Sequence, residues 1–270
     1  PYIQRFNSKI IVIKYGGSVM EDEILSKEVF KDIVLLKFVG MKPIVIHGGG
    51  KEITSLMKKL GIPSKFVSGH RITDKETLDI VEMILAGKIN KRIVAGINAQ
   101  GGLAIGLSGK DANLIRAEKL VLNESLDLGY VGEIKNINVK LLSSLIEEEY
   151  IPVISSIGID KKGQGYNINA DIVAGKVAQS LKAEKLIYLT DIEGVLDREE
   201  GVISHLSIKQ AKELIERGDI VGGMLPKVNS GIEALMGGVK KVHIINGTFA
   251  HSILLELFTE GGIGTEIVQN

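Results

Sequence analysis

The chain has 270 residues and is electrically balanced, with 33 basic and 33 acidic side chains and a formal net charge of zero at pH 7. Aromatic residues make up 4% of it and tryptophan is absent, so it offers neither the basic surface nor the stacking side chains typical of nucleic-acid binders. It contains no cysteine, which excludes disulfides, thiol catalysis and thiolate metal sites, and its five histidines show no metal-ligand spacing.

The length suits one large α/β domain or two lobes with a sizeable apolar core. No apolar run is long enough to span a bilayer, and the first residues have neither the basic start nor the apolar core of a signal peptide. We therefore expect a cytoplasmic protein without a membrane or nucleic-acid partner. Because the first residue is Pro1 and not Met, we allow for a missing N-terminal segment.

The first predicted strand ends in a glycine pair. Residues 10–13 are four consecutive β-branched residues, and they run into Lys14, Gly16 and Gly17. Glycines at the carboxyl end of a strand let backbone N–H groups approach a ligand, which is how α/β proteins commonly bind phosphate. A lysine beside such a loop supplies positive charge for a polyphosphate. Alone, the run is equally compatible with an ordinary strand whose lysine reaches water.

A second copy of this arrangement covers residues 43–50. Its apolar run ends in Gly48, Gly49 and Gly50, and the residues that follow carry the apolar stripe of a helix. The N-terminus of that helix offers unpaired N–H donors and a partial positive charge to an anion. Two such loops would meet at the carboxyl edge of a parallel sheet. Neither a Walker loop nor a dinucleotide-binding fingerprint is present.

The rest of the chain alternates predicted strands and helices. A long helix is predicted to begin at Thr73, in a capping box, and to extend towards residue 99, either within the core or, less favoured, against another subunit. Residues 108–136 are interpreted as hairpins at the edge of the sheet. Further strands are predicted at 104–107, 151–157, 186–189, 241–245 and 264–268, and helices at 22–38, 140–149, 173–181, 207–217 and 227–237. The alternation predicts a largely parallel sheet covered on both faces, with ligands at its carboxyl edge.

Six motifs in this order span nearly the whole chain: IKYGGS, HGGG, GHRITD, GYNINAD, LTDIEGVL and GGMLPKV. Together they resemble the amino acid kinase family, and within it the arginine-inhibited branch that acts on N-acetyl-L-glutamate. The resemblance implies a three-layer αβα sandwich around a mostly parallel sheet, in two lobes. Residues 1–180 would form the lobe for the amino-acid substrate and subunit contacts, and residues 181–270 the lobe for ATP.

The implied reaction transfers the γ-phosphoryl group of MgATP to the side-chain carboxylate of N-acetylglutamate, the second step of arginine biosynthesis. Such a transfer needs mainly positioning and charge neutralisation, and a carboxylate nucleophile needs no base at neutral pH. By resemblance, Lys14 contacts the phosphates from the substrate side, Lys227 contacts them from the nucleotide side, and Asp171 holds both lysines. The alternatives are a solvated lysine in a first helical turn for Lys227 and a simple helix N-cap for Asp171.

The resemblance also implies residues that bind the two substrates. Arg71 matches a clamp on a substrate carboxylate, although a lone arginine can also be a surface ion-pair partner, and Asn167 matches a substrate-binding amide. The implied substrate residues are Gly16, Gly17, Gly48, Gly49, Gly50, Arg71, Asn167 and, as a turn residue behind them, Asn169. The implied nucleotide residues are Asp191, Ile192, Glu193, Gly194, Val195, Leu196, Asp219, Ile220 and Val221. Since no carboxylate cluster for magnesium is evident, the metal is expected to be held mainly by ATP and water.

Two rival functions remain open. A sister kinase of the same fold would act on carrier-bound aminoadipate or on glutamate, but GHRITD and YNINAD favour acetylglutamate. A non-enzymatic sensor would have kept only the anion loops. The presence of Lys14, Lys227 and Asp171 together argues against a sensor, because passive binding does not require a cation on each side of a transferring phosphoryl group.

The two ends of the chain resemble the arginine-inhibited branch. In that branch an N-terminal helix interlaces homodimers into a hexamer, and residues 1–6 would be the tail of such a helix. Arginine would bind between this helix and the C-terminal lobe, with Glu256 as the guanidinium partner and the loop of Gly262 and Gly264 offering backbone groups. The alternative is that Glu256 lies on the solvated face of a terminal amphipathic helix.

Overall fold

The computed structural model describes residues 6–67, 69–122, 126–259 and 261–270. Its main sheet has eight strands in the order β12-β14-β13-β11-β1-β2-β8-β5, and all neighbouring pairs are parallel except β13 with β14. The strands are β1 (Ile10–Tyr15), β2 (Lys42–His47), β5 (Ala104–Ser108), β8 (Ile151–Ser155), β11 (Lys185–Thr190), β12 (His205–Ser207), β13 (Lys241–Asn246) and β14 (Thr265–Val268). The predicted α/β class and mostly parallel sheet are confirmed.

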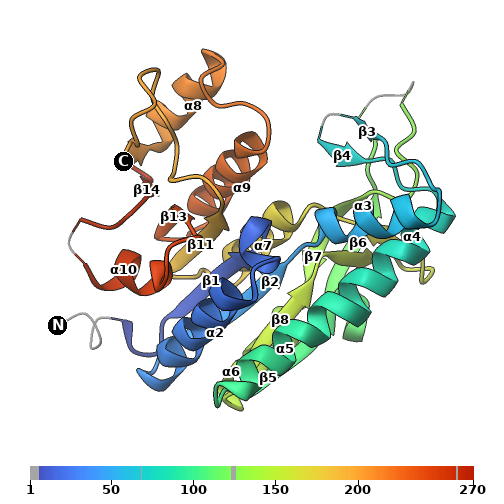
Figure 1. Ribbon diagram of the computed structural model, residues 1–270, viewed down its shortest axis with the longest axis horizontal. Coiled ribbons are helices and arrows are strands. Elements are labelled where there is room, and N and C mark those ends of the chain that lie inside the picture. Colours follow the sequence, from blue (N-terminus) through green and yellow to red (C-terminus); the bar gives the residue numbers. More distant parts are fainter. Residues whose placement is uncertain (1–5, 68, 123–125, 260) are drawn as a thin grey trace.

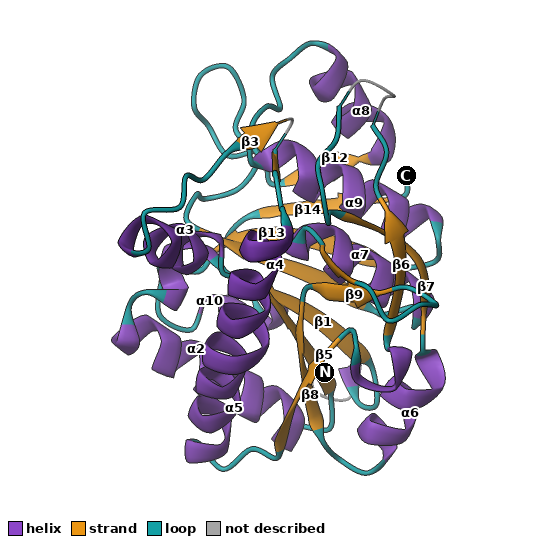
Figure 2. Ribbon diagram, turned by 90° about the vertical axis from the view of Figure 1, so that its right-hand side faces the viewer, coloured by secondary structure: helices purple, strands orange, loops and turns teal. Residues whose placement is uncertain are grey.

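Helices cover both faces of this sheet (Figures 1 and 2). One face packs against α2 (Glu23–Phe38), α3 (Gly50–Lys59), α4 (Lys75–Glu82), α5 (Asn90–Ala99) and α10 (Ser252–Phe258). The other packs against α6 (Val139–Glu147), α7 (Ala170–Ser180), α8 (Ile208–Glu216) and α9 (Met224–Met236). Because strand side chains alternate between faces, Ile11 and Ile13 enter the first core and Val12 enters the second. The result is the three-layer sandwich.

The interpretation of residues 108–136 as hairpins at the edge of the main sheet is wrong. Strands β6 (Ile115–Lys119) and β7 (Gly132–Ile137) do pair antiparallel, but they join β9 (Ile157–Ile159) and β10 (Gly165–Asn167) in a separate four-stranded sheet. The core that contains α7 also contains four residues of this sheet, Ile115, Ala117, Ile137 and Tyr166. The sheet that a strand joins depends on contacts with residues distant in sequence. A local sequence pattern does not show those contacts.

The long helix reaches Ala99 as predicted, but it begins at Lys75 and not at Thr73. Asp74 is the N-cap, accepting a hydrogen bond from the Thr77 amide at 2.8 Å, whereas the Thr73 hydroxyl donates to the carbonyl of Arg71 at 2.8 Å. Between α4 and α5, the segment Met83–Ile89 is a π-helix. Such segments are rare and occur frequently at functional sites.

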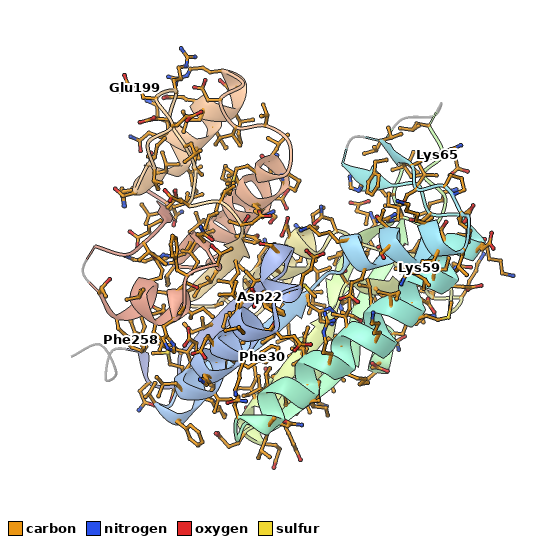
Figure 3. All side chains as sticks on the ribbon, viewed as in Figure 1. Asp22, Phe30, Lys59, Lys65, Glu199 and Phe258 are labelled. Atoms are coloured by element: carbon orange, nitrogen blue, oxygen red, sulfur yellow. The ribbon has the colours of Figure 1, made fainter. Side chains whose placement is uncertain are left out.

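The long helix packs into the core. Figure 3 labels Phe30 on α2, and a Cβ atom built on Gly96 of α5 would lie 2.3 Å from the Phe30 ring. The absence of a side chain at Gly96 therefore lets these two helices approach, as core packing predicts.

Residues after 180 gather at one end of the molecule, where Figure 1 shows α8, α9 and α10 in orange and red. The eight-stranded sheet nevertheless runs without interruption from one end to the other. The division into two lobes near residue 180 stays a prediction. Among the described residues, no helix is both long enough and apolar enough to cross a membrane.

Candidate active site

Three charged side chains from three elements meet near the carboxyl end of β1. Lys14 lies on β1, Asp171 in the first turn of α7 and Lys227 in the first turn of α9. The Lys14 Nζ atom is 3.1 Å from Asp171 Oδ1, and the Lys227 Nζ atom is 3.1 Å from Asp171 Oδ2. All three side chains are largely buried. One carboxylate thus bridges two ammonium groups.

The electrostatics of this trio favour an anionic ligand. Burial acts to raise the pKa of Asp171, but the charges of Lys14 and Lys227 outweigh it and hold the pKa below its ordinary value. The carboxylate therefore stays ionised at neutral pH. Two cations facing one anion leave one positive charge of the trio uncompensated, next to two glycine loops.

Asp171 is not the N-cap of α7, so that alternative is wrong. Asn169 caps the helix, because its Oδ1 atom accepts a hydrogen bond from the Asp171 amide at 2.8 Å. Because Asn169 caps the helix, the Asp171 carboxylate is available to pair with both lysines. Lys14 reaches it because Lys14 and Val12 share the sheet face on which α7 packs.

A second contact joins the two helices that carry Asp171 and Lys227. The Ser230 hydroxyl on α9 donates to the Asp171 carbonyl at 2.9 Å, and the fully buried Tyr188 hydroxyl is hydrogen-bonded to Ser230. Gly175 permits this crossing, since a Cβ atom there would lie 2.9 Å from the Ser230 carbonyl oxygen. Sequence reasoning missed Tyr188 and Ser230, and no local pattern marks them.

The glycine loops are closely packed. A Cβ atom on Gly16 would lie 2.6 Å from the Lys14 Nζ atom, and Gly17 has a φ of +74°. On Gly49, a Cβ atom would lie 2.2 Å from Ile89 and 2.8 Å from Leu85, both in the π-helix. A side chain at Gly49 would therefore collide with the π-helix, and one at Gly16 would displace the end of the Lys14 side chain.

A cavity of about 140 Å³ adjoins the second glycine loop. Its lining combines apolar side chains with six of the predicted substrate residues, namely Gly48, Gly49, Gly50, Arg71, Asn167 and Asn169. Gly16 and Gly17 lie on the neighbouring loop after β1. The structure thus brings the predicted substrate residues to two adjacent loops and the cavity between the sheet edge and α7.

Arg71 is buried and not a surface ion-pair partner, so that alternative is wrong. Its guanidinium donates to the Gly50 carbonyl at 2.9 Å and to Thr54 Oγ1 at 2.8 Å, and it lies 4.6 Å from the centre of the Phe66 ring. Burial lowers its pKa, yet a guanidinium keeps its charge in proteins. Within the described part of the chain no carboxylate pairs with it. A buried, uncompensated cation in a cavity wall is a place for an anion.

The predicted nucleotide residues lie beside the first glycine loop. Residues 191–196 follow β11, and a Cβ atom on Gly17 would lie 3.9 Å from the Asp191 amide nitrogen. The side chains of Ile192 and Val221 are exposed, and Asp219 accepts hydrogen bonds from Arg198 and Arg217. Contact of this segment with a nucleotide stays a prediction.

Glu256 lies in the wall of a second cavity, of about 360 Å³, whose lining includes Gly262 and Gly264. Its carboxylate is 2.5 Å from His243 Nδ1 and accepts a hydrogen bond from the Ile263 amide at 2.7 Å. Glu256 is buried, so its placement on a solvated helix face is wrong. α10 packs against α2 on one side and against β13 on the other. The pattern of its seven residues does not show that both sides are covered. Of the predicted N-terminal tail, residues 1–5 lie outside the described residues.

The parallel sheet, its paired glycine loops and the two lysines around one buried carboxylate form the arrangement of a small-molecule kinase. Residues 9–246 match the amino acid kinase family, and the chain belongs to this family. A relative from Caldanaerobacter subterraneus subsp. tengcongensis, named acetylglutamate kinase, is 54% identical over 270 residues, which cover 99% of this chain and 90% of that protein.

Two solved structures of Neisseria gonorrhoeae N-acetylglutamate synthase are similar over 100% of this chain. The one complexed with coenzyme A and N-acetyl-glutamate has a TM-score of 0.91 at 27% identity, and the one complexed with coenzyme A and L-arginine has 0.88 at 25%. The chain spans 62% and 63% of the length of these synthase chains.

Proposed function

We propose that this protein is a kinase that uses ATP to phosphorylate the side-chain carboxylate of N-acetyl-L-glutamate, the second step of arginine biosynthesis. The observation that carries the proposal is the pairing of two cationic features at one sheet edge. Lys14 and Lys227 bracket Asp171, and the uncompensated guanidinium of Arg71 lines the adjacent cavity. The acetylglutamate kinase relative supports the same assignment.

We propose a role for each group. A substrate carboxylate oxygen attacks the γ-phosphorus while the bond from that phosphorus to the β,γ-bridging oxygen breaks, which yields an acyl phosphate and ADP. Lys14 and Lys227 neutralise charge on the transferring group, and Asp171 keeps both ammonium groups in place. Arg71 holds the second carboxylate of the substrate, and Asn167 contacts the acetylated nitrogen.

ATP would enter with Mg²⁺. The donors at this edge, which are ammonium groups and backbone N–H groups of glycine loops, suit phosphate oxygens and not a metal ion. Among the described residues no cluster of three or more His, Cys, Asp or Glu side chains is placed to hold a metal. We therefore propose that the phosphates and water supply most of the ligands of the metal. We also propose that residues 191–196 and 219–221 contact the adenosine.

A coupled assay tests the proposed function. With MgATP and N-acetylglutamate, the protein is expected to produce ADP and an acyl phosphate that hydroxylamine traps. Glutamate, aminoadipate and a carrier-bound form of aminoadipate serve as competing acceptors. Faster turnover of any of them would overturn the substrate assignment, and no turnover with any acceptor would favour a binding protein over an enzyme.

We also propose that arginine inhibits this enzyme from the cavity of Glu256. Its wall offers the Glu256 carboxylate to a guanidinium, and Phe6 reaches the same cavity, with its ring 5.2 Å from Lys185 Nζ. The similar synthase structure is complexed with L-arginine, which supports the proposal that this fold can bind arginine. In this proposal, homodimers assemble further into hexamers through the N-terminal helix.

Arginine is expected to raise the apparent KM for acetylglutamate several-fold, since coupling between sites is typically worth about 1 to 3 kcal/mol. The titration is done while light scattering measures particle size. Glu256→Gln should lose inhibition and keep basal turnover. Dimers only, with activity unchanged up to millimolar arginine, would contradict both parts of the proposal.

A further inference from the structure

His47 is a fully buried histidine directly beneath the second glycine loop. It is the last residue of β2 and pairs in register with Tyr15 of β1. Its side chain therefore points to the sheet face opposite to that of Lys14, where α5 packs. Asn90, the first residue of α5, directly follows the π-helix and is buried against the ring.

The contacts of Asn90 determine which ring nitrogen of His47 carries the proton. The Asn90 Nδ2 atom is 2.9 Å from the Val153 carbonyl oxygen, which can only accept, so this atom is the amide nitrogen and donates. The same nitrogen is 3.1 Å from His47 Nε2 and 3.4 Å from the Leu107 carbonyl oxygen, and an amide nitrogen donates but does not accept. Nε2 therefore accepts, and the proton of the neutral ring is on Nδ1. Nδ1–H donates to the Gly48 carbonyl at 3.1 Å.

Two further observations agree with this assignment. Burial lowers the pKa of His47 to about 4, so the ring is neutral and has a single N–H at physiological pH. A Cβ atom on Gly106 would lie 2.0 Å from Asn90 Oδ1, so glycine in β5 leaves the space that the amide occupies.

The hydrogen bond to Gly48 sets the orientation of the next peptide group. Since a trans peptide is planar, a Gly48 carbonyl that points down to the ring turns the Gly49 N–H to the opposite side. Gly48 and Gly49 line the cavity, and the His47 ring is not among its lining residues. Among the described residues, the Gly49 amide has no hydrogen-bond partner. Leu85 and Ile89 of the π-helix fill the space that a Cβ atom on Gly49 would need.

We propose that His47 and Asn90 are positioning residues, which fix the Gly48–Gly49 peptide so that the Gly49 N–H points at the transferring phosphoryl group. This inference rests on the proposed kinase function, because the N–H would stabilise charge that develops in phosphoryl transfer. Neither side chain touches the substrate. Both act through the backbone of the loop.

Three variants separate this role from simple packing. His47→Asn keeps a donor at the position of Nδ1 and loses the acceptor, whereas His47→Leu loses both, and Asn90→Leu removes the donor to the ring. Val45→Ala serves as the matched control, because Val45 is fully buried, lies on the same strand two residues before His47 and has no polar group to bind the loop. Thermal unfolding of each variant reports the structural cost.

Removing one preorganised donor to a developing anion typically costs about 10²- to 10³-fold in kcat, and a misaligned donor should cost less. We expect His47→Leu and Asn90→Leu to lower kcat by about tenfold or more at saturating ATP and N-acetylglutamate, with each KM within about threefold. His47→Asn should recover part of the loss. The affinity for ADP with aluminium fluoride and N-acetylglutamate should fall in parallel with kcat, and that for ADP alone should not.

The tautomer is measured independently of activity, by ¹⁵N NMR of histidine-labelled wild-type protein, which should show His47 protonated on Nδ1 alone at pH 7. A proton on Nε2, or kcat losses no greater than that of Val45→Ala, would overturn this inference while leaving the kinase assignment intact. Absence of turnover by the wild-type protein, in contrast, would overturn the proposed function itself and this inference with it.

Discussion

Replacement of Lys14 or Lys227 by alanine is expected to lower kcat by on the order of a hundredfold or more, while substrate affinity changes less. In the proposed reaction each ammonium group faces the transferring phosphoryl group, where negative charge is greatest in the transition state. Both lysines are held by the same carboxylate, so removal of either one also frees Asp171 to repel the phosphates. Steady-state kinetics with both substrates varied measure the effect.

Lys14→Arg is expected not to restore activity. A forked guanidinium is larger than an ammonium, and the Lys14 Nζ atom lies close over Gly16, 2.6 Å from the position that a Cβ atom there would take. Lys176→Ala is the matched control, because Lys176 on α7 pairs with Glu233 at 2.8 Å at the surface. Its kcat should equal that of the wild type. A raised KM at unchanged kcat for the Lys14 or Lys227 variants would contradict their assigned roles.

Asp171→Asn should be costly both to stability and to catalysis. It leaves two buried ammonium groups facing a neutral amide, and breaking a buried ion pair by removing one partner typically costs about 3 kcal/mol or more of unfolding free energy. We expect a kcat loss comparable with those of the lysine variants, because the ammonium groups would separate. Urea unfolding and steady-state kinetics measure the two effects.

Glu52→Gln is the control for this change. The Glu52 carboxylate also bridges two cations, with Lys88 Nζ at 2.9 Å and Arg92 Nη2 at 2.6 Å, but both partners are exposed. Surface ion pairs contribute about 0 to 1 kcal/mol, so Glu52→Gln should unfold nearly as the wild type does. Equal losses of unfolding free energy in the two variants would show that the buried ion pairs of Asp171 contribute no more to stability than the exposed ones of Glu52.

The pH dependence of the Asp171 effect has a definite sign. The folded-state pKa of Asp171 lies below its ordinary value of 3.8, so its charge stabilises the fold at every pH above that value. The stability difference between wild type and Asp171→Asn should therefore be constant from pH 8 to pH 5. It should shrink only as the pH falls below about 4 and the folded-state carboxyl gains its proton. A difference that disappears near pH 6 would contradict the assigned ion pairs.

Local patterns in the sequence predicted most of the main sheet. The β-branched runs at β1, β2 and β11 form buried strands, and the glycines that follow β1 and β2 do lie at the carboxyl edge. These features are local, because burial of a parallel strand on both faces demands an unbroken apolar run. The cap of the long helix was misplaced by one residue, since both Thr73 and Asp74 are good caps and only their tertiary contacts decide between them.

The sequence by itself determined which segments form the sheet edge and which residue types line it, through apolar periodicity and the position of the glycines. Only the tertiary structure decided which side chains meet. The hydrogen bond from Ser230 to the Asp171 carbonyl and the contact of Asn90 with His47 join residues that are distant in sequence. A hydrogen bond requires two groups to be close in space. The sequence sets that distance only for residues a few positions apart, as in one turn of a helix.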